Sequence, residues 1–541
     1  MRRVIAAALV LALMPVPAFT ASAQSAPEEQ ATDTAGSVIG AYYKDFYEKK
    51  YRQALADIKD LSPDASNKDG QAIVKAMRAG ALLGLKHDSE ARKLIAEVRQ
   101  LSPQDPTADA TLFDAGLLTE HYDVSADSLD EMLARYPDAV RELGDEAVGF
   151  LLSHEPKGQD RRNEDRRIEL ARIGFGGELK GDYLTVGAVK ILAKRGDWAG
   201  ATDLLRYIDE PQLIEGMLIQ KRFSHLWPAI ADIAGQHLSK ARQSSVATAE
   251  RAYQAAPEDA EKLQLYADAL RHAGRLDDAI ALKSKLPATR EGMAAADEKT
   301  GWVVNSIAYA LYDVGRGDEG DRLFAMLNEP PRADAGWRVS MIINRLEMLV
   351  VNGKFETASS LLPATELSAK NDGNAYAQQL VRRLKYCTLS SLGKKAEAAG
   401  LLPELMSHAA DAADATVGGL LCAGQADQAE QLVLQTLNSQ DVGKRENFES
   451  DFVRDLQPVA LTGDDPSVWQ GRWTELRRRP AIAAAYERLG RDRGRTLDVP
   501  DKGGRFLVDP SDSRPSSDVE DEVRASKNAR RRRKPTRRRR R

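Results

Sequence analysis

Apolar residues recur along most of this chain at intervals of three and four positions, the spacing that places them on one face of an α-helix. The segment 263–270 is one such run, and the segment 279–286, which Pro287 ends, is the next. Between them lies a short polar stretch that begins with Gly274. This pattern predicts two antiparallel helices joined by a tight turn, a helical hairpin.

The turn belongs to a motif that recurs: a glycine, four mostly polar residues, and a small residue that opens an apolar run. Six copies begin with glycine, at 196–201, 274–279, 315–320, 353–358, 393–398 and 424–429. Two copies without the glycine end at Ala54 and Ala91. Adjacent copies place their small residues 31 to 41 positions apart, and two longer gaps of 110 and 78 are close to three and two periods. We therefore expect less regular copies in 104–190 and 205–250.

The residue types of the motif explain why it forms a hairpin. Glycine adopts the left-handed conformation that ends one helix, and an Asp or Glu after it caps the next helix. The small residue allows the two helices to approach closely. Because a lone hairpin cannot bury both of its apolar faces, neighbouring hairpins are expected to stack. The prediction is an all-α solenoid of antiparallel helix hairpins.

Two segments resemble a known repeat family. The run 265–279 and the run 82–103 are similar to tetratricopeptide repeats, and Ala91, Ile95, Val98 and Pro103 occupy that repeat's small, bulky, small and proline positions. The resemblance extends over about eight hairpins between residues 40 and 440 and is weaker in the two irregular regions. It implies a right-handed superhelix whose inner surface binds peptides or other proteins. It implies no catalysis.

The ends of the chain differ from its body. Residues 1–23 read as a signal peptide, because Arg2 and Arg3 precede a short apolar run and Ala-Ser-Ala at 21–23 suits cleavage before Gln24. The mature protein is then periplasmic or secreted; an uncleaved amphipathic start is the alternative. Residues 24–37 are predicted to be a flexible lead-in and 38–490 the solenoid, with two capping helices whose arginines solvate its outer face. No stretch reaches the length of a membrane span.

Composition and charge single out residues 491–541, which are predicted to be disordered. The chain has 541 residues and a net charge of -4, but its last 15 residues carry eleven basic side chains and no acidic ones. We expect this tail to bind polyanions, through Arg530, Arg531, Arg532, Arg533, Lys534, Arg537, Arg538, Arg539, Arg540 and Arg541. After export the expected partners are anionic lipid, lipopolysaccharide or the acidic body of the chain, and nucleic acid is disfavoured. A solvated tail without a ligand is the alternative.

The helix predicted around 302–312 offers a candidate surface for a protein partner. Trp302, Asn305, Tyr309 and Tyr312 fall at i, i+3, i+7 and i+10, away from its apolar stripe. The family resemblance would place such first-helix residues along the concave groove, where Trp and Tyr often dominate binding. The alternative is that these rings pack against neighbouring repeats.

The two cysteines, Cys387 and Cys422, lie 35 positions apart in first helices of adjacent repeats. They could pair in an oxidising compartment. Their offsets from the following small residue differ, 11 before Ala398 and 7 before Ala429, which favours two separate buried thiols.

Signals of catalysis are weak throughout the sequence. The seven histidines are scattered, and no zinc, dinucleotide, phosphate-loop or serine-hydrolase motif is present. We therefore predict no catalytic residue, no cofactor and no metal site. The expected function is a non-catalytic interaction scaffold of the bacterial cell envelope; the alternative is an accessory or regulatory subunit for envelope polysaccharide or outer-membrane assembly. A solenoid hydrolase is a third, weaker possibility.

Overall fold

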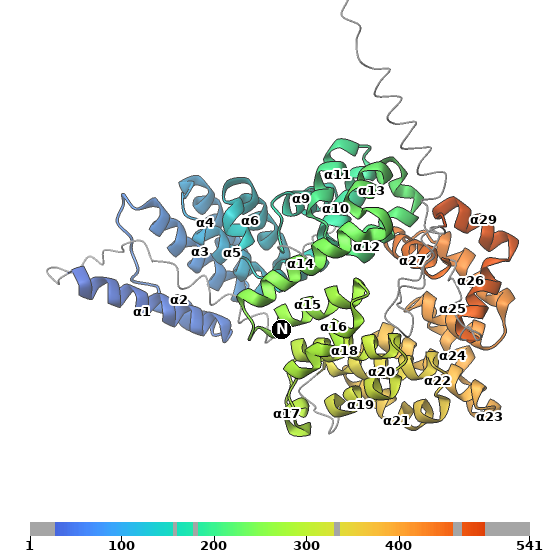
Figure 1. The fold of residues 1–541 in the computed structure, drawn as a ribbon. Helices are drawn as coiled ribbons and strands as arrows, with labels where there is room; N and C mark the ends of the chain where they lie inside the picture. Colours follow the sequence, from blue (N-terminus) through green and yellow to red (C-terminus); the bar gives the residue numbers. More distant parts are fainter. Residues whose placement is uncertain (1–27, 155–159, 177–181, 329–335, 458–467, 493–541) are drawn as a thin grey trace, which may run out of the picture. The chain divides into compact units, whose positions relative to one another are not determined.

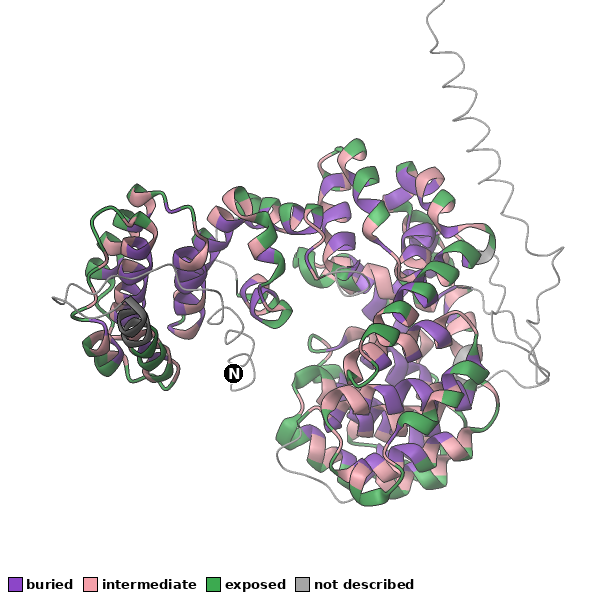
Figure 2. Ribbon diagram, turned by 60° about the vertical axis from the view of Figure 1, so that its left-hand side comes forward, coloured by how far each residue is buried: buried purple, intermediate pink, exposed green. Residues whose placement is uncertain are grey.

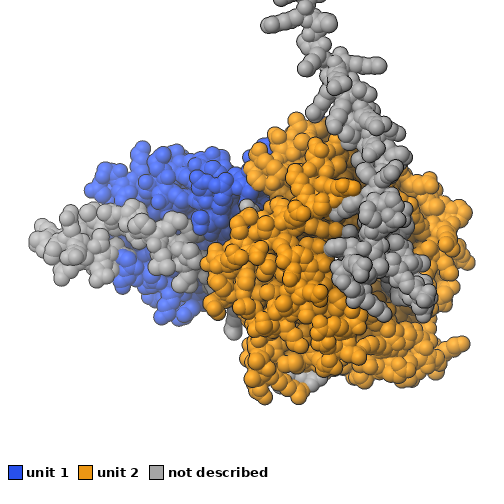
Figure 3. Space-filling view, in the orientation of Figure 1, with its two compact units in different colours: residues 1–196 blue, residues 197–541 orange. Residues whose placement is uncertain are grey.

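The computed structural model describes residues 28–154, 160–176, 182–328, 336–457 and 468–492. Throughout these residues the regular secondary structure is helical, and their one β-type pairing is an isolated bridge between Gln220 and Gly490. The all-helical prediction is confirmed. The chain divides into two units, residues 1–196 and 197–541 (Figure 3).

Unit 1 is built from helices that pair as consecutive hairpins, α1 with α2, α3 with α4 and α5 with α6 (Figure 1). The first helices of the second and third hairpins, α3 and α5, also contact each other. The helices are α1 (Glu28–Tyr47), α2 (Tyr51–Asp57), α3 (Lys68–Gly84), α4 (Asp88–Leu101), α5 (Thr107–Leu118), α6 (Tyr122–Arg135), α7 (Pro137–Arg141), α8 (Asp145–Ser153), α9 (Asp160–Arg172) and α10 (Asp182–Lys194).

Unit 2 begins with short helices and 3-10 turns and continues with longer hairpins. Its first part contains α11 (Trp198–Leu204), η3 (Leu205–Tyr207), α12 (Pro211–Ile219), η4 (Lys221–Leu226), α13 (Trp227–Ala234), η5 (Gln236–Leu238) and α14 (Ser239–Ala255). Pro211 and Pro228 stand in the first turns of α12 and α13, which explains why the predicted irregular region 205–250 is broken into short pieces.

The later hairpins of unit 2 follow the sequence motif. Their helices are α15 (Ala260–His272), α16 (Leu276–Ala281), η6 (Leu282–Lys285), α17 (Arg290–Ala294), α18 (Glu298–Asp313), α19 (Gly317–Asn328), α20 (Arg338–Val351), α21 (Phe355–Asp372), α22 (Ala375–Ser391), α23 (Lys395–Ala398), α24 (Leu401–Ser407), α25 (Ala413–Cys422) and α26 (Ala426–Leu437). Three further helices complete the unit: α27 (Val442–Asp455), α28 (Val468–Arg477) and α29 (Pro480–Leu489).

The predicted turn is present at every glycine of the motif. The six glycines have φ between 69° and 77°, the left-handed region that glycine adopts without a steric penalty. At five of the six, all except Gly196, the N–H of the following residue donates to the carbonyl of a leucine five positions earlier, as from Arg275 to Leu270 at 2.9 Å and from Lys354 to Leu349 at 2.9 Å. This bond closes the end of the first helix as in a Schellman motif. The small residues five positions after the glycines are all buried.

Copies without glycine use the same backbone conformation. Lys49, Lys86 and Glu120 have φ of 62°, 65° and 63°. The small residues five positions later, Ala54, Ala91 and Ser125, have no exposed surface. Ser125 lies in 104–190, so at least one of the less regular copies expected there is present. These three positions show that the turn is fixed by the packing of the hairpin even where a side chain must adopt a strained backbone.

The cores lie between the helices of each hairpin and between neighbouring hairpins, as the buried sides of the helices in Figure 2 show. Alanine and leucine predominate in them, with occasional large side chains such as Tyr42 and Phe113 in unit 1 and Phe324 in unit 2. The small side chains allow helices to approach closely. The cores are correspondingly distributed along each unit as several clusters.

Unit 2 closes on itself. Going along the chain, α12, α14, α15, α18, α20, α22, α25 and α27 each contact the next, and α27 in turn contacts α12. Two hydrogen bonds of Arg491 hold the junction: its backbone N–H donates to the carbonyl of Ile219 at 2.9 Å, and its side-chain Nε donates to the carbonyl of Leu218 at 2.7 Å. Ile219 is buried in the same core cluster as Val453 and Tyr486. The first-helix stack of this unit is therefore a closed ring.

The ends of the predicted solenoid need two corrections. Helix α1 begins at Glu28, inside the segment 24–37 that was expected to be flexible. The packed structure also continues past residue 490, because Arg491 and Asp492 take part in hydrogen bonds of unit 2. The signal peptide at 1–23 and the tail from 493 lie outside the described residues. Among the described helices, none is both long and apolar enough to cross a membrane.

Two helices close the chain as predicted, but their arginines do not simply solvate an outer face. Arg477 donates to the carbonyl of Leu456 at 2.6 Å and pairs with Asp492, and Arg479 pairs with Asp427 and Glu430. Since α29 also contacts α27 and η4, these helices join the two ends of the ring.

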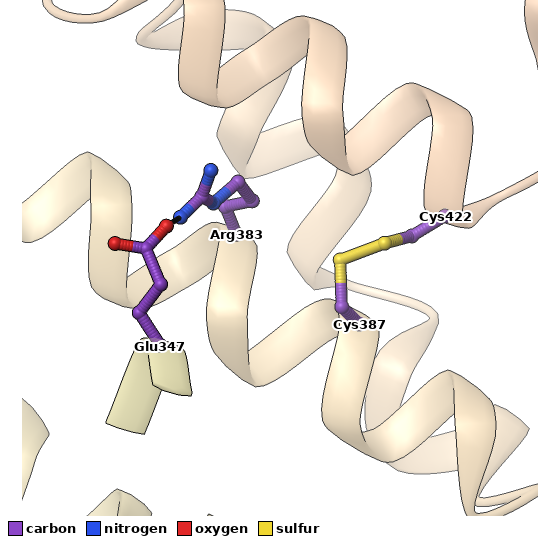
Figure 4. The surroundings of a disulfide bond; sticks show 4 residues. All are labelled: Glu347, Arg383, Cys387 and Cys422. Carbon is purple, nitrogen blue, oxygen red and sulfur yellow. Dashed lines mark hydrogen bonds and ion pairs between the residues drawn. A yellow bond between two sulfur atoms is a disulfide. The ribbon is translucent and has the colours of Figure 1, made fainter. Parts of the chain in front are cut away.

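The cysteines form a disulfide, and the prediction of two separate buried thiols is wrong. Cys387 on α22 and Cys422 on α25 have Cα atoms 5.4 Å apart and are bonded (Figure 4). The different offsets from the small residue had indicated that the two cysteines point to different faces. Because α22 and α25 are adjacent first helices in contact, those positions nevertheless meet.

Candidate functional site

A continuous row of charged and aromatic side chains runs across consecutive first helices of unit 2. We call this row the polar track. Its members come from the residue before α12, from α15, α18, α20, α22, α25, α27 and α28, and from the segment after α29: Glu210, Asp268, Arg271, Tyr309, Asp313, Glu347, Tyr376, Arg383, Asp414, Asp451, Arg454, Asp455, Trp473, Arg477, Arg478 and Asp492. Each member interacts with, or lines the same cavity as, another member.

The first part of the track joins α15 to α18. Arg271 Nε donates to a carboxylate oxygen of Asp313 at 3.3 Å, and its guanidinium lies over the ring of Tyr309, 4.8 Å from the centroid. The hydroxyl of Ser306 donates to Asp268. Burial and, to a smaller extent, the charge of nearby Asp268 together raise the pKa of Glu210 to about 7. Carboxylates thus lie close to one another in this part of the track.

The middle of the track joins α20 to α22 through an ion pair. Arg383 is 8% exposed and donates to Glu347, as Figure 4 shows. Burial raises the pKa of the Tyr309 phenol, and the negative charge of nearby Glu347 raises it as well. Cys387 follows Arg383 by one helical turn on α22, so the disulfide holds α22 against α25 beside this pair.

The last part of the track joins α22, α25 and α27. The hydroxyl of Tyr376 donates to Asp414 at 3.4 Å. Burial, which is the larger cause, and the charge of Asp414 together raise the pKa of Tyr376 to about 12. Arg454 pairs with Asp451 at 3.0 Å and with Asp455 at 3.1 Å. Burial raises the pKa of the Asp455 carboxyl although Arg454 opposes that shift. This end of the track therefore holds several carboxylates in a partly dehydrated setting.

The same helices enclose a cavity of about 680 Å³. Side chains from α20, α22, α25, α27 and α28 line it together with Asp492. Its wall combines two aromatic rings, Tyr376 and Trp473, with apolar surface from Leu380 and with both signs of charge. A volume of this size accommodates a few amino-acid side chains or a small ligand. This combination of aromatic and charged side chains suits a polar ligand that carries positively charged and planar groups.

The four residues predicted to contact a partner lie on α18, but only Tyr309 belongs to the polar track. Asn305 is buried and accepts a hydrogen bond from Asn344 on α20 at 2.9 Å. Tyr312 is buried and packs against the turn and helix α19, where its ring contacts the backbone at Gly317 and Gly320. Trp302 is half-buried at the edge of the same core cluster. Asn305, Tyr312 and Trp302 therefore pack against neighbouring helices, which was the alternative given for them in the sequence analysis. Partner binding by the four residues stays a prediction.

Most track residues were missed because each is isolated in the sequence. Register relative to the turn glycine could have found them. Asp268, Tyr309 and Glu347 each stand six positions before a turn glycine. Arg383 and Asp414 each stand ten positions before one, as does Asn305, which is polar but lies outside the track. Positions four apart lie on one face of a helix, so polar residues recurring at these two offsets mark a single polar face across the repeats.

The described residues contain no group of three or more His, Cys, Asp and Glu side chains placed to hold a metal ion. His272, on α15, is half-buried, and its desolvation together with nearby Arg271 lowers its pKa to about 4, so it is neutral at physiological pH. The basic tail residues from Arg530 to Arg541 lie outside the described residues. No protein-family model matches the chain, and no curated protein matches it.

Proposed function

We propose that this protein is an exported, non-catalytic scaffold that binds other proteins on the polar track and its cavity. The observation that carries the proposal is the register of the track: α15, α18 and α20 each present a track residue six positions before the turn glycine, α22 and α25 each present one ten positions before it, and the row ends in the cavity. A row of this kind offers one recognition position per repeat, which suits an extended segment of a partner.

The repeat chemistry supports a tetratricopeptide-like architecture with the right-handed superhelix of that family. The left-handed turn, the buried small residue five positions later and the contacts between adjacent first helices all fit it. Closure of unit 2 through Arg491 is a feature that the resemblance does not imply. It fixes the spacing of the first helices and so favours a preformed binding surface over one that opens to accept a partner.

The proposed compartment is the bacterial envelope, either the periplasm or the medium. The disulfide supports it, because such bonds form and persist in oxidising compartments. The residues at 1–23 read as a signal peptide with a mature start at Gln24. We further propose that the tail from Arg530 to Arg541 tethers the scaffold to an anionic surface such as lipid or lipopolysaccharide.

Proximity labelling in the source organism tests the scaffold role with matched variants of the full chain. Tyr376→Ala and Asp414→Asn alter the exposed end of the track, and Glu356→Gln alters an exposed carboxylate on the second helix α21. We expect a defined set of partners to be lost with the two track variants and kept with the control. An unchanged set in all three would contradict the proposed binding surface. Turnover of peptidoglycan or polysaccharide above background would contradict the non-catalytic role.

A further inference from the structure

We propose that the cavity of unit 2 is an arginine-binding site and that its occupant is the chain's own basic run, Arg530–Arg541. The inference rests on the proposed binding role of the cavity and names the chemistry of its ligand. Bound there, the run would be withheld from anionic surfaces and would exclude a competing basic partner from the cavity.

The cavity has a carboxylate and an aromatic ring arranged for a guanidinium. Asp414 forms no ion pair with any cation of the described residues and accepts one hydrogen bond, from Tyr376 at 3.4 Å. Tyr376 is 46% exposed, so its ring remains available to a ligand. Arginine binds carboxylates through paired N–H donors and stacks on aromatic faces, and Asp414 with Tyr376 offers both.

Most of the cations that line the cavity are already neutralised. Arg383 pairs with Glu347, Arg454 with Asp451 and Asp455, and Arg477 with Asp492. Arg478 is exposed at the rim. The described cavity wall holds four carboxylates and four guanidinium groups, namely Glu347, Asp414, Asp455 and Asp492 with Arg383, Arg454, Arg477 and Arg478. Asp414 is the carboxylate among these that forms no ion pair with a described cation, so it is the group that attracts a further cation.

The basic run is tethered within reach of this site. Asp492, the last described residue, itself lines the cavity. Thirty-seven residues, 493–529, separate it from Arg530. A chain of that length spans roughly 120 Å when fully extended, so the covalent connection is long enough for the run to return to the cavity. A covalent tether makes this contact intramolecular, which raises the concentration of the run near the site above that of a free partner.

Zero-length carbodiimide cross-linking of the mature full-length protein tests the assignment directly. The reagent joins a lysine amine to a carboxylate in contact with it, and Lys534 lies inside the basic run. We expect Lys534 to cross-link to Asp414, Glu347 or Asp455 in low salt, with at least a fivefold loss at 500 mM salt. Cross-links of Lys534 spread evenly over exposed carboxylates such as Asp277 and Glu356 would overturn the proposal.

Mixing isotopically light and heavy protein separates an occupant in the same chain from a second copy. Cross-links within one isotope class support the assignment, and a majority between classes would overturn it in favour of exchange between copies. Cross-linking needs no substitution and so does not depend on how a variant folds.

A binding measurement provides the second test. A labelled peptide with the sequence of residues 527–541 is titrated into full-length protein whose tail arginines are changed to glutamine. We expect saturable binding that weakens at least tenfold with Asp414→Asn and changes less than twofold with Glu356→Gln. Equal binding by both variants would overturn the site. If proximity labelling still loses partners with Asp414→Asn while the peptide and Lys534 avoid the cavity, the scaffold role stands and this inference alone fails.

Discussion

The guanidinium of Arg491 lies over the indole of Trp227, 3.3 Å from the ring centroid, although 264 positions separate the two residues. Trp227 opens α13 near the start of unit 2 and Arg491 follows its last helix. The contact is one of several that close the ring of first helices, together with the ion pair of Arg222 and Glu449 at 2.9 Å.

Removing this contact should open the ring. Arg491→Ala deletes the stacking on Trp227 and the hydrogen bond to Leu218, and we expect it to lower the stability of unit 2 by about 1–3 kcal/mol. Hydrogen exchange would report the opening as faster exchange at Ile219 and Gln220. Arg488→Ala, at an exposed position of α29, is the control and should leave exchange there unchanged.

The disulfide should stabilise unit 2 substantially. It closes a chain segment of 35 positions between α22 and α25, and cross-links of that size contribute about 2–4 kcal/mol, mainly by restricting the unfolded chain. Cys387→Ser with Cys422→Ser, or treatment with a reductant, is expected to lower the melting temperature. The double variant should not respond further to reductant, and a shift of equal size in both proteins would show that reduction acts elsewhere.

The sequence predicted those features of the fold that depend on residues a few positions apart, and it did not predict those that depend on contacts between distant segments. The turn at Gly274 and the burial of Ala279 follow from residue types a few positions apart, and both predictions are confirmed. The pairing of Cys387 with Cys422 required the relative rotation of two helices, which sequence offsets alone do not fix. Closure through Arg491 could not be predicted at all, because no local pattern relates it to Trp227.

The candidate site shows the same limit. Tyr309 could be found because it shares a helix with three other conspicuous residues, and it does lie on the polar track. Asp414 was missed, since a single aspartate in a helix is usually a solvated surface residue and only its offset of ten positions from Gly424 distinguishes it. Asp414 becomes a candidate binding residue only because Tyr376, on a different helix, donates to it and both side chains line the cavity.

The turn glycines should be intolerant of side chains for backbone reasons alone. A methyl group at Gly393 would meet nothing within 4 Å, but its φ of 72° is unfavourable for any L-residue, so Gly393→Ala should cost about 1 kcal/mol. Gly216→Ala, inside α12, is the control; its added methyl group has only an ordinary contact at 3.9 Å and should be neutral or stabilising. Chemical denaturation measures both. Equal effects would show that the turn conformation is not the cause.

The stability of unit 1 should depend on pH through Asp114. The hydroxyl of Tyr47 on α1 donates to this carboxylate on α5 at 3.3 Å, and burial raises the pKa of Asp114 to about 7. Between pH of about 4 and 7 the folded state therefore keeps a proton that the unfolded state has released, so the free energy of unfolding should fall as the pH rises through this range. Asp114→Asn stays neutral and should remove that decline.

Hydrogen exchange of α1 and α5 at pH 5 and pH 8 measures the effect within the full chain. Wild-type protein should exchange faster at pH 8, after correction for the intrinsic rate, and Asp114→Asn should show little difference between the two conditions. Asp60→Asn is the matched control, because its side chain is 89% exposed and its removal should leave the wild-type decline in place. If the decline persists in Asp114→Asn, the loss of stability arises from another group and the buried contact between Tyr47 and Asp114 does not control it.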